Sequence, residues 1–158
     1  MKTKIENLLK EAAIRTFENI CFMFVEPDLE DTQKNLALEA AAEVKFRGNY
    51  SGKLIIESRG GLSLAIAVNM LSNNHPGSQQ KKDALGEIAN IICGNVVPAL
   101  GRRKELGYKI ESPVFLKKIE LMKMKEEKKK PLAEVTLNFN EGRADIKFFV
   151  DDYPFQEK

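Results

Sequence analysis

The chain has 158 residues, of which 43% are hydrophobic and 30% are charged, and its formal net charge is only +2. These values are ordinary for one globular domain, and folding a chain of this length buries roughly 70% of its unfolded surface. The balanced charge gives no sign of a nucleic-acid partner or an acidic membrane surface, so we expect neither.

The first part of the chain alternates between helical and strand patterns. Apolar residues at helical spacing predict a helix over residues 3–25, which Pro27 ends. An alternating pattern predicts a half-buried strand over residues 36–47, and a glycine-flanked turn leads to a returning strand over residues 54–57. After Gly60 and Gly61, two further helices are predicted, over residues 62–71 and 79–97.

The second part of the chain is predicted to be mostly strands. Residues 114–124 are predicted as a strand, because Phe115, Ile119 and Leu121 share a parity, and a lysine-rich loop follows. Two alternating runs separated by Asn140, Glu141 and Gly142 predict a final hairpin, and residues 151–158 are expected to be a flexible tail.

These elements predict one α+β domain over residues 1–158. The strands follow one another largely as hairpins, which indicates an antiparallel sheet with one face covered by the helices. The longest apolar run, Ile20 to Val25, has six residues, whereas a membrane-spanning helix needs about 20. No signal peptide is recognisable at the N-terminus, so a cytoplasmic protein is expected.

The cysteine and histidine content restricts the possible chemistry. Cys21 and Cys93 both lie in apolar helical segments, which is typical of buried reduced thiols. The single histidine, His75, lies in a predicted loop without the motif of a hydrolase nucleophile, and no phosphate-binding glycine loop is present. A histidine-rich metal site is excluded. An enzyme of this composition would use carboxylates, amides or groups of a partner.

The helix predicted over residues 79–97 carries the most informative pattern. Asp83, Glu87, Asn90 and Gly94 share one face, because they follow each other at intervals of four, three and four residues. The other side is apolar and is expected to face the core; it comprises Leu85, Ile88, Ile92, Val96 and Ala99. The polar face is either a docking surface that presents a carboxylate and a carboxamide, or an ordinary solvated face. A glycine on it can also let another backbone approach.

These residues resemble the motif of the CheC, CheX and FliY phosphatases, (Asp/Ser)-x3-Glu-x2-Asn-x22-Pro. Asp83, Glu87 and Asn90 match its first three positions, and Pro113 follows the 22 intervening residues 91–112. The run from Gly86 to Asn95 is also similar to the corresponding helix of the CheX branch. The resemblance implies a CheC-like fold with pseudo-duplicated halves.

The resemblance also implies a function: hydrolysis of the aspartyl phosphate of a response regulator such as phospho-CheY, in chemotaxis or a related two-component pathway. Asn90 would hold the attacking water and Glu87 would pair with a lysine of the regulator, while Asp83, Gly94 and Pro113 would support the site or contact the partner. The chain itself would need no cofactor or metal, because Mg²⁺ belongs to the regulator. A homodimer is expected.

The expected second copy of the motif is incomplete. In the first helix Asn19 lines up with Asn90, but Thr16 replaces the glutamate, Ala12 replaces the aspartate, and Ala42 stands where the proline should be. A single active site, as in the CheX type, is therefore expected, with residues 12–19 as a degenerate half-site.

Two other functions remain open. The same helix could dock a response regulator without turnover, or the chain could be a small hydrolase or ligand-binding domain with an apolar pocket elsewhere. The lysines between residues 117 and 130 are interpreted as a solvated strand and loop, since they lack arginine and stacking aromatic residues.

Overall fold

A six-stranded antiparallel sheet organises the protein. The computed structural model describes residues 2–100, 107–127, 129–151 and 153. Four long strands lie in the order β1-β2-β6-β5, with two short strands beyond β1. Their bounds are β1 (Leu38–Arg47), β2 (Gly52–Gly60), β3 (Lys109–Ile110), β4 (Val114–Leu116), β5 (Ala133–Phe139) and β6 (Gly142–Val150). The antiparallel sheet predicted from the hairpins is confirmed.

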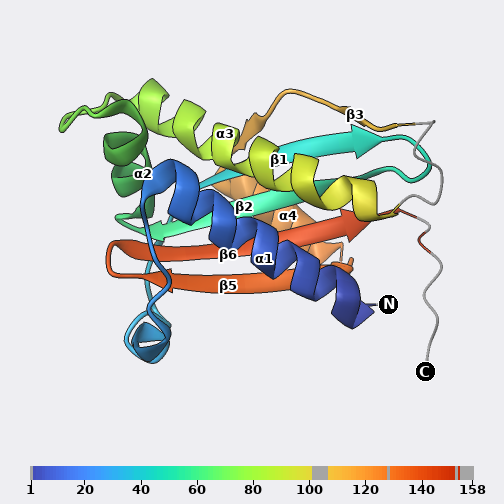
Figure 1. Cartoon of the computed structure of the whole chain (residues 1–158), viewed down its shortest axis with the longest axis horizontal. Helices are drawn as coiled ribbons and strands as arrows, with labels where there is room; N and C mark the ends of the chain where they lie inside the picture. Colours follow the sequence, from blue (N-terminus) through green and yellow to red (C-terminus); the bar gives the residue numbers. More distant parts are fainter. Residues whose placement is uncertain (1, 101–106, 128, 152, 154–158) are drawn as a thin grey trace.

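Helices lie on both faces of this sheet, not on one face as the strand pattern predicted, although one face carries most of them (Figure 1). On one face lie α1 (Lys2–Cys21), α2 (Leu62–Leu71) and α3 (Ser78–Val96), with α1 packed against β5 and α3 against β1. The single-turn helices η1 (Pro27–Leu29) and η2 (Val97–Leu100) lie in the connections after α1 and α3. The short helix α4 (Lys118–Glu126) lies on the opposite face, behind the sheet in Figure 1.

The main core lies between the three helices and the sheet. Alternate residues of each strand point into it, as the period of two predicted: Val44 and Phe46 from β1, and Ile146 and Phe148 from β6, are fully or almost fully buried. The rings of Phe46 and Phe148 stack with centroids 5.5 Å apart. Burying each such side chain contributes roughly 1.5–3 kcal/mol. This core fixes the helices on the sheet.

The opposite sheet face carries a polar network. Glu57, only 2% exposed, accepts hydrogen bonds from Arg59 and Lys147, both at 2.9 Å. Asp145 accepts from Arg59 at 2.8 Å and from Arg143 at 3.0 Å. The predicted half-buried strands are therefore polar on this face, but their charged residues are largely covered and paired.

Two predicted elements differ from the structure: the first helix is shorter than predicted, and most of one predicted strand is a helix. The first helix ends at Cys21, not at residue 25, because Phe22 takes a left-handed conformation with φ 54° and the N–H of Met23 bonds back to the carbonyl of Phe17. The strand predicted over residues 114–124 is limited to β4, and α4 follows it. Ile119, predicted to share a strand face with Leu121, is 62% exposed, whereas Leu121 is 6% exposed.

The start of α4 explains this second difference. The Glu120 carboxylate accepts a hydrogen bond from the N–H of Lys117 at 3.2 Å, which caps the first turn of the helix. Leu121 is buried against Ala41, Ile55 and Leu116 of the sheet, and Met124 packs beside it. A spacing of three residues between Leu121 and Met124 fits a helix better than a strand.

Other predicted elements agree with the structure in kind, although β2 extends on both sides of the strand predicted over residues 54–57. The helix over residues 62–71 has those bounds, and α3 begins one residue before the predicted start and ends one residue before the predicted end. Of the expected tail, residues 152 and 154–158 lie outside the described residues. In the described part of the chain, no helix is long and apolar enough to span a membrane.

Candidate functional site

Helix α3 positions the candidate site. At its start, the Gln80 side-chain oxygen accepts a hydrogen bond from the N–H of Gly77 at 2.8 Å. Its buried residues then fix its rotation on the sheet; they are Ala84, Leu85, Gly86, Ile88, Ala89, Ile92, Cys93 and Val96. Ala99, expected on this buried side, is instead exposed, because the helix ends at Val96 and η2 turns it outward.

The polar face predicted on α3 points away from the core. Asp83 and Glu87 are exposed, while Asn90 and Gly94 are partly exposed. The Asp83 carboxylate accepts a hydrogen bond from the Gln79 side chain at 2.8 Å, one turn earlier. Within the described residues, neither Glu87 nor Asn90 makes a side-chain hydrogen bond or an ion pair. Both side chains are therefore available to a partner.

Pro113 is brought against this helix, although it lies 23 residues beyond Asn90 in the sequence. It packs on Gly86, where an added Cβ would lie 2.9 Å from the Pro113 Cβ and 3.4 Å from its Cγ. Real Cβ atoms essentially never come that close, so Gly86 must lack a side chain for Pro113 to occupy this place. The structure thus joins the fourth position of the motif to the first three.

The segment from Ile110 to Pro113 forms one flank of the site. Gly86, Asn90 and Gly94 follow each other every four residues, so they lie in one row along α3. Pro113 contacts the row at Gly86. At Gly94, an added Cβ would lie 3.7 Å from the Ile110 Cδ1, which is an ordinary van der Waals distance. Asn90 therefore lies between the two contacts. The glycine required for close approach is Gly86, which the sequence did not single out for that purpose, rather than Gly94.

This flank is tied to the sheet as well as to α3. The N–H of Glu111 donates to the carbonyl of Lys45 in β1 at 2.8 Å. Phe115 pairs with Ala42 in the sheet, and the Lys82 ammonium lies 4.5 Å from the centroid of its ring. Rigid support of this kind holds a site's geometry better than a free loop would.

The predicted half-site on α1 does not offer a comparable pair. The Thr16 hydroxyl, 4% exposed, donates to the Ala12 carbonyl at 2.7 Å, so it is committed to its own helix. Asn19 is exposed but has no carboxylate one turn before it. A degenerate repeat at residues 12–19 stays a hypothesis.

The remaining candidates for chemistry are inert or structural. Burial raises the pKa of both Cys21 and Cys93 to about 12, so neither supplies a thiolate near neutral pH. His75 lies in a loop, where its N–H bonds to the side-chain oxygen of Asn73 at 3.0 Å. Among the described residues, no group of three or more His, Cys, Asp or Glu side chains could hold a metal ion.

The fold and the site together define a class of protein. A helix laid across an antiparallel sheet presents a free carboxylate and a free carboxamide one turn apart, beside a fixed proline, and the described residues hold no metal-binding cluster. A face of this kind is suited to contacts with a second protein.

Comparison with known families identifies the chain more closely. A family model described as chemotaxis phosphatase CheX matches residues 40–138, which include α3 and Pro113. The chain belongs to this family, as the motif predicted. No curated protein sequence matches it at a significant level.

Solved structures of the same fold include members of all three branches. CheX from Vibrio vulnificus has a TM-score of 0.65 at 16% identity, covering 96% of this chain and 99% of that one. A CheX–CheY–BeF3–Mg complex from Borrelia burgdorferi gives 0.62 at 17% identity, covering 91% and 96%. FliY from Thermotoga maritima gives 0.57 at 14% identity, covering 95% and 88%. At these identities the likeness concerns the fold, and it confirms the CheC-like architecture.

Proposed function

We propose that this protein hydrolyses the aspartyl phosphate of a CheY-like response regulator, with Glu87 and Asn90 as its active pair. The observation that carries the proposal is the free carboxylate and carboxamide on the outward face of α3, with Asn90 in the row between the contacts of Pro113 at Gly86 and Ile110 at Gly94. Membership of a chemotaxis phosphatase family supports it, as does the related CheX found in complex with CheY.

In this mechanism Asn90 positions the nucleophile. Its carboxamide can donate one hydrogen bond and accept another at any pH near neutral, so it can orient a water molecule in line with the phosphorus. The water oxygen bonds to phosphorus, and the bond between phosphorus and the aspartyl oxygen breaks. The products are inorganic phosphate and the regulator's free carboxylate. The Mg²⁺ and lysine of the regulator offset the charge that develops on the phosphoryl oxygens.

The other site residues align the two proteins. Glu87, exposed and without an ion pair among the described residues, can pair with the regulator's lysine. Asp83 contacts Gln79 and lies one turn away, which suits a supporting contact rather than a reacting group. Pro113 shapes the flank through Gly86. Gly94 has no side chain to project from the far end of the face, so the partner can approach Asn90.

Loss of phosphate from a phosphorylated, Mg²⁺-bound regulator tests this function. With Asn90→Ala, kcat is expected to fall by about 10²-fold or more, because one positioning group is worth that much in the transition state. With Glu87→Ala, KM is expected to rise as well. Full activity of Asn90→Ala would show that the roles are misassigned. Binding of the regulator without turnover by the wild type would instead make this a docking domain.

We also propose that the protein acts as a cytoplasmic homodimer and needs no metal of its own. The support is its membership of the CheX family, one member of which is known in a complex with CheY, BeF3 and Mg²⁺. Light scattering during size-exclusion chromatography measures the oligomeric state. To test the metal requirement, the protein alone is treated with a chelator and is then assayed with Mg²⁺-loaded regulator. Full phosphatase activity is expected.

A further inference from the structure

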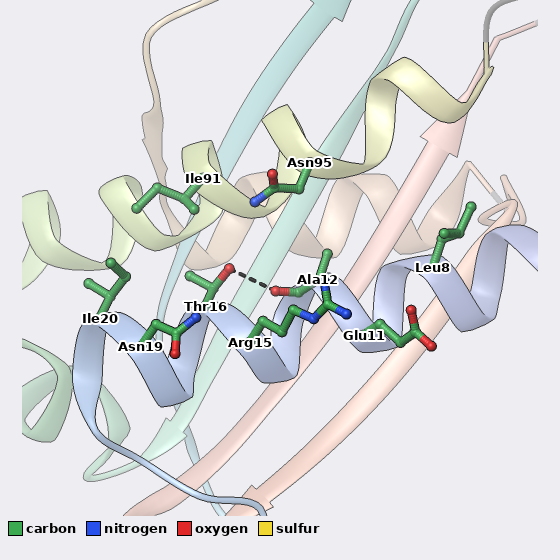
Figure 2. Close-up of a pocket in the computed structure, with 9 residues that line it drawn as sticks. All are labelled: Leu8, Glu11, Ala12, Arg15, Thr16, Asn19, Ile20, Ile91 and Asn95. Carbon is green, nitrogen blue, oxygen red and sulfur yellow. Dashed lines mark hydrogen bonds between the residues drawn. The ribbon is translucent and has the colours of Figure 1, made fainter.

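A groove of about 320 Å³ lies between α1 and α3, on the flank of the catalytic helix away from Pro113. Figure 2 shows the Asn95 carboxamide entering it from α3 above Ala12 and Thr16 of α1, with Ile91 and Ile20 at one end. The floor of the groove offers no free polar group at Thr16, because the Thr16 hydroxyl donates its hydrogen bond to the Ala12 carbonyl. Its rim is polar.

The groove adjoins the catalytic face directly. Ile91 and Asn95, its α3 residues, follow Asn90 and Gly94 in the sequence, and one residue is a rotation of about 100° around a helix. Glu87 therefore lies on the crest of α3, the Ile110–Pro113 segment lies on one side, and the groove lies on the other. The groove is thus part of the surface that surrounds the active pair.

A docked regulator must reach beyond α3 on both sides. A specific protein–protein interface covers about 800 Å² on each partner, which is a patch about 30 Å across. A helix with its side chains is only about 10 Å wide. A regulator centred on Asn90 therefore covers the Ile110–Pro113 flank and the groove together.

The charges on this surface are uneven. The face of α3 carries two carboxylates, Asp83 and Glu87. A regulator that binds Mg²⁺ beside its phosphorylated aspartate also presents carboxylates there, because oxygen ligands hold that ion. Two charged side chains line the groove, Glu11 and Arg15. Arg15 is the cationic one, and among the described residues it makes no ion pair or hydrogen bond. It can offset the repulsion between the two acidic surfaces.

Building on the proposed phosphatase function, we propose that the α1–α3 groove receives an acidic surface loop of the regulator, whose carboxylate pairs with Arg15. The exposed carboxamides of Asn19 and Asn95 both donate and accept, so they can bind the main chain of that loop. Arg15 and Asn95 are then specificity determinants. They decide which phosphorylated regulator docks, while Asn90 decides how fast it reacts.

Steady-state kinetics on the phosphorylated regulator separate these roles. Arg15→Glu reverses the charge, and Asn95→Phe fills the groove from an exposed position of α3. Each is expected to raise KM about tenfold or more and to leave kcat within about twofold, since neither touches the reacting atoms. The difference between wild type and Arg15→Glu should shrink at high salt. Arg47→Glu is the matched control, because Arg47 is equally exposed but points to the opposite face of the sheet.

The outcomes distinguish the two proposals. If Asn90→Ala abolishes turnover but Arg15→Glu and Asn95→Phe keep the wild-type KM, the groove proposal is wrong and the phosphatase function stands. If the wild type binds a beryllofluoride-activated regulator without hydrolysing the phosphorylated form, the function is wrong. In that case, calorimetric Kd values for the same variants test the groove proposal. Weaker binding by Arg15→Glu supports the proposal, and unchanged binding overturns it.

Discussion

At the scale of single residues, packing requires a glycine at position 86 but not at position 94. At Gly86 an added methyl group would collide with the ring of Pro113, whereas at Gly94 it would make an ordinary contact with Ile110. Gly86→Ala is therefore expected to lower thermal stability and to reduce kcat about 10- to 100-fold by displacing the flank beside Asn90.

Gly94→Ala supplies the matched comparison for stability. It should raise the free energy of unfolding by about 0.5–1 kcal/mol, because alanine is the better residue inside a helix and has room here. Denaturant unfolding of both variants measures the effect. Equal effects of the two substitutions would contradict the packing of Pro113 on α3.

The motif spacing located the face of α3 and the proline that approaches it, but it could not rank the two glycines. Helical periodicity places Asp83, Glu87 and Asn90 on one side whatever lies next to them. Which glycine meets a neighbour depends on how the chain returns from residue 107 to Pro113, and that is a tertiary contact. The groove beside α1 was missed for the same reason, since its two walls are more than 70 residues apart.

At the scale of elements, α4 shows where sequence periodicity fails. Phe115, Ile119 and Leu121 share an even spacing, and three such residues cannot distinguish a strand from a short strand followed by a helix. The long elements gave no such ambiguity, because α1, α3 and the final hairpin each repeat their period several times. The sequence lacks the usual start signal, because Lys117 stands where a capping box has Ser or Thr, and only the structure shows its N–H bonded to Glu120.

Paired truncations test the orientation of α4. Leu121→Ala should destabilise the protein by about 2–4 kcal/mol, because Leu121 is 6% exposed and packs on Ala41 and Ile55. Ile119→Ala should change stability by less than about 0.5 kcal/mol, since Ile119 is 62% exposed. Chemical denaturation gives both values. A large loss at Ile119 with none at Leu121 would favour a different rotation of this helix or another element.

At the scale of the whole molecule, Asp145 joins three strands on the sheet face opposite α3. Its carboxylate in β6 accepts hydrogen bonds from Arg59 of β2 at 2.8 Å and from Thr136 of β5 at 3.0 Å, as well as from Arg143. Burial alone would raise the pKa of Asp145. The hydrogen bonds from Arg143, Arg59 and Thr136 outweigh burial and lower the pKa below the ordinary 3.8.

This lowered pKa makes part of the fold's stability dependent on acid. A carboxyl group with a depressed pKa in the folded state stabilises the protein fully above its unfolded pKa, and this contribution is lost as the pH falls through the lower folded value. The wild type should therefore lose stability below about pH 4. Asp145→Asn should be less stable at pH 7, because Arg59 and Arg143 keep their burial but lose a charged partner.

The decisive measurement is the free energy of unfolding of both proteins from pH 7 down to pH 3. The gap between wild type and Asp145→Asn should be widest at pH 7 and should narrow below pH 4, because the wild-type carboxylate also becomes neutral there. A constant gap would mean that Asp145 acts through packing rather than charge. Because this network lies on the face away from α3, Asp145→Asn should leave KM for the regulator unchanged while the protein is folded, which separates stability from docking in one variant.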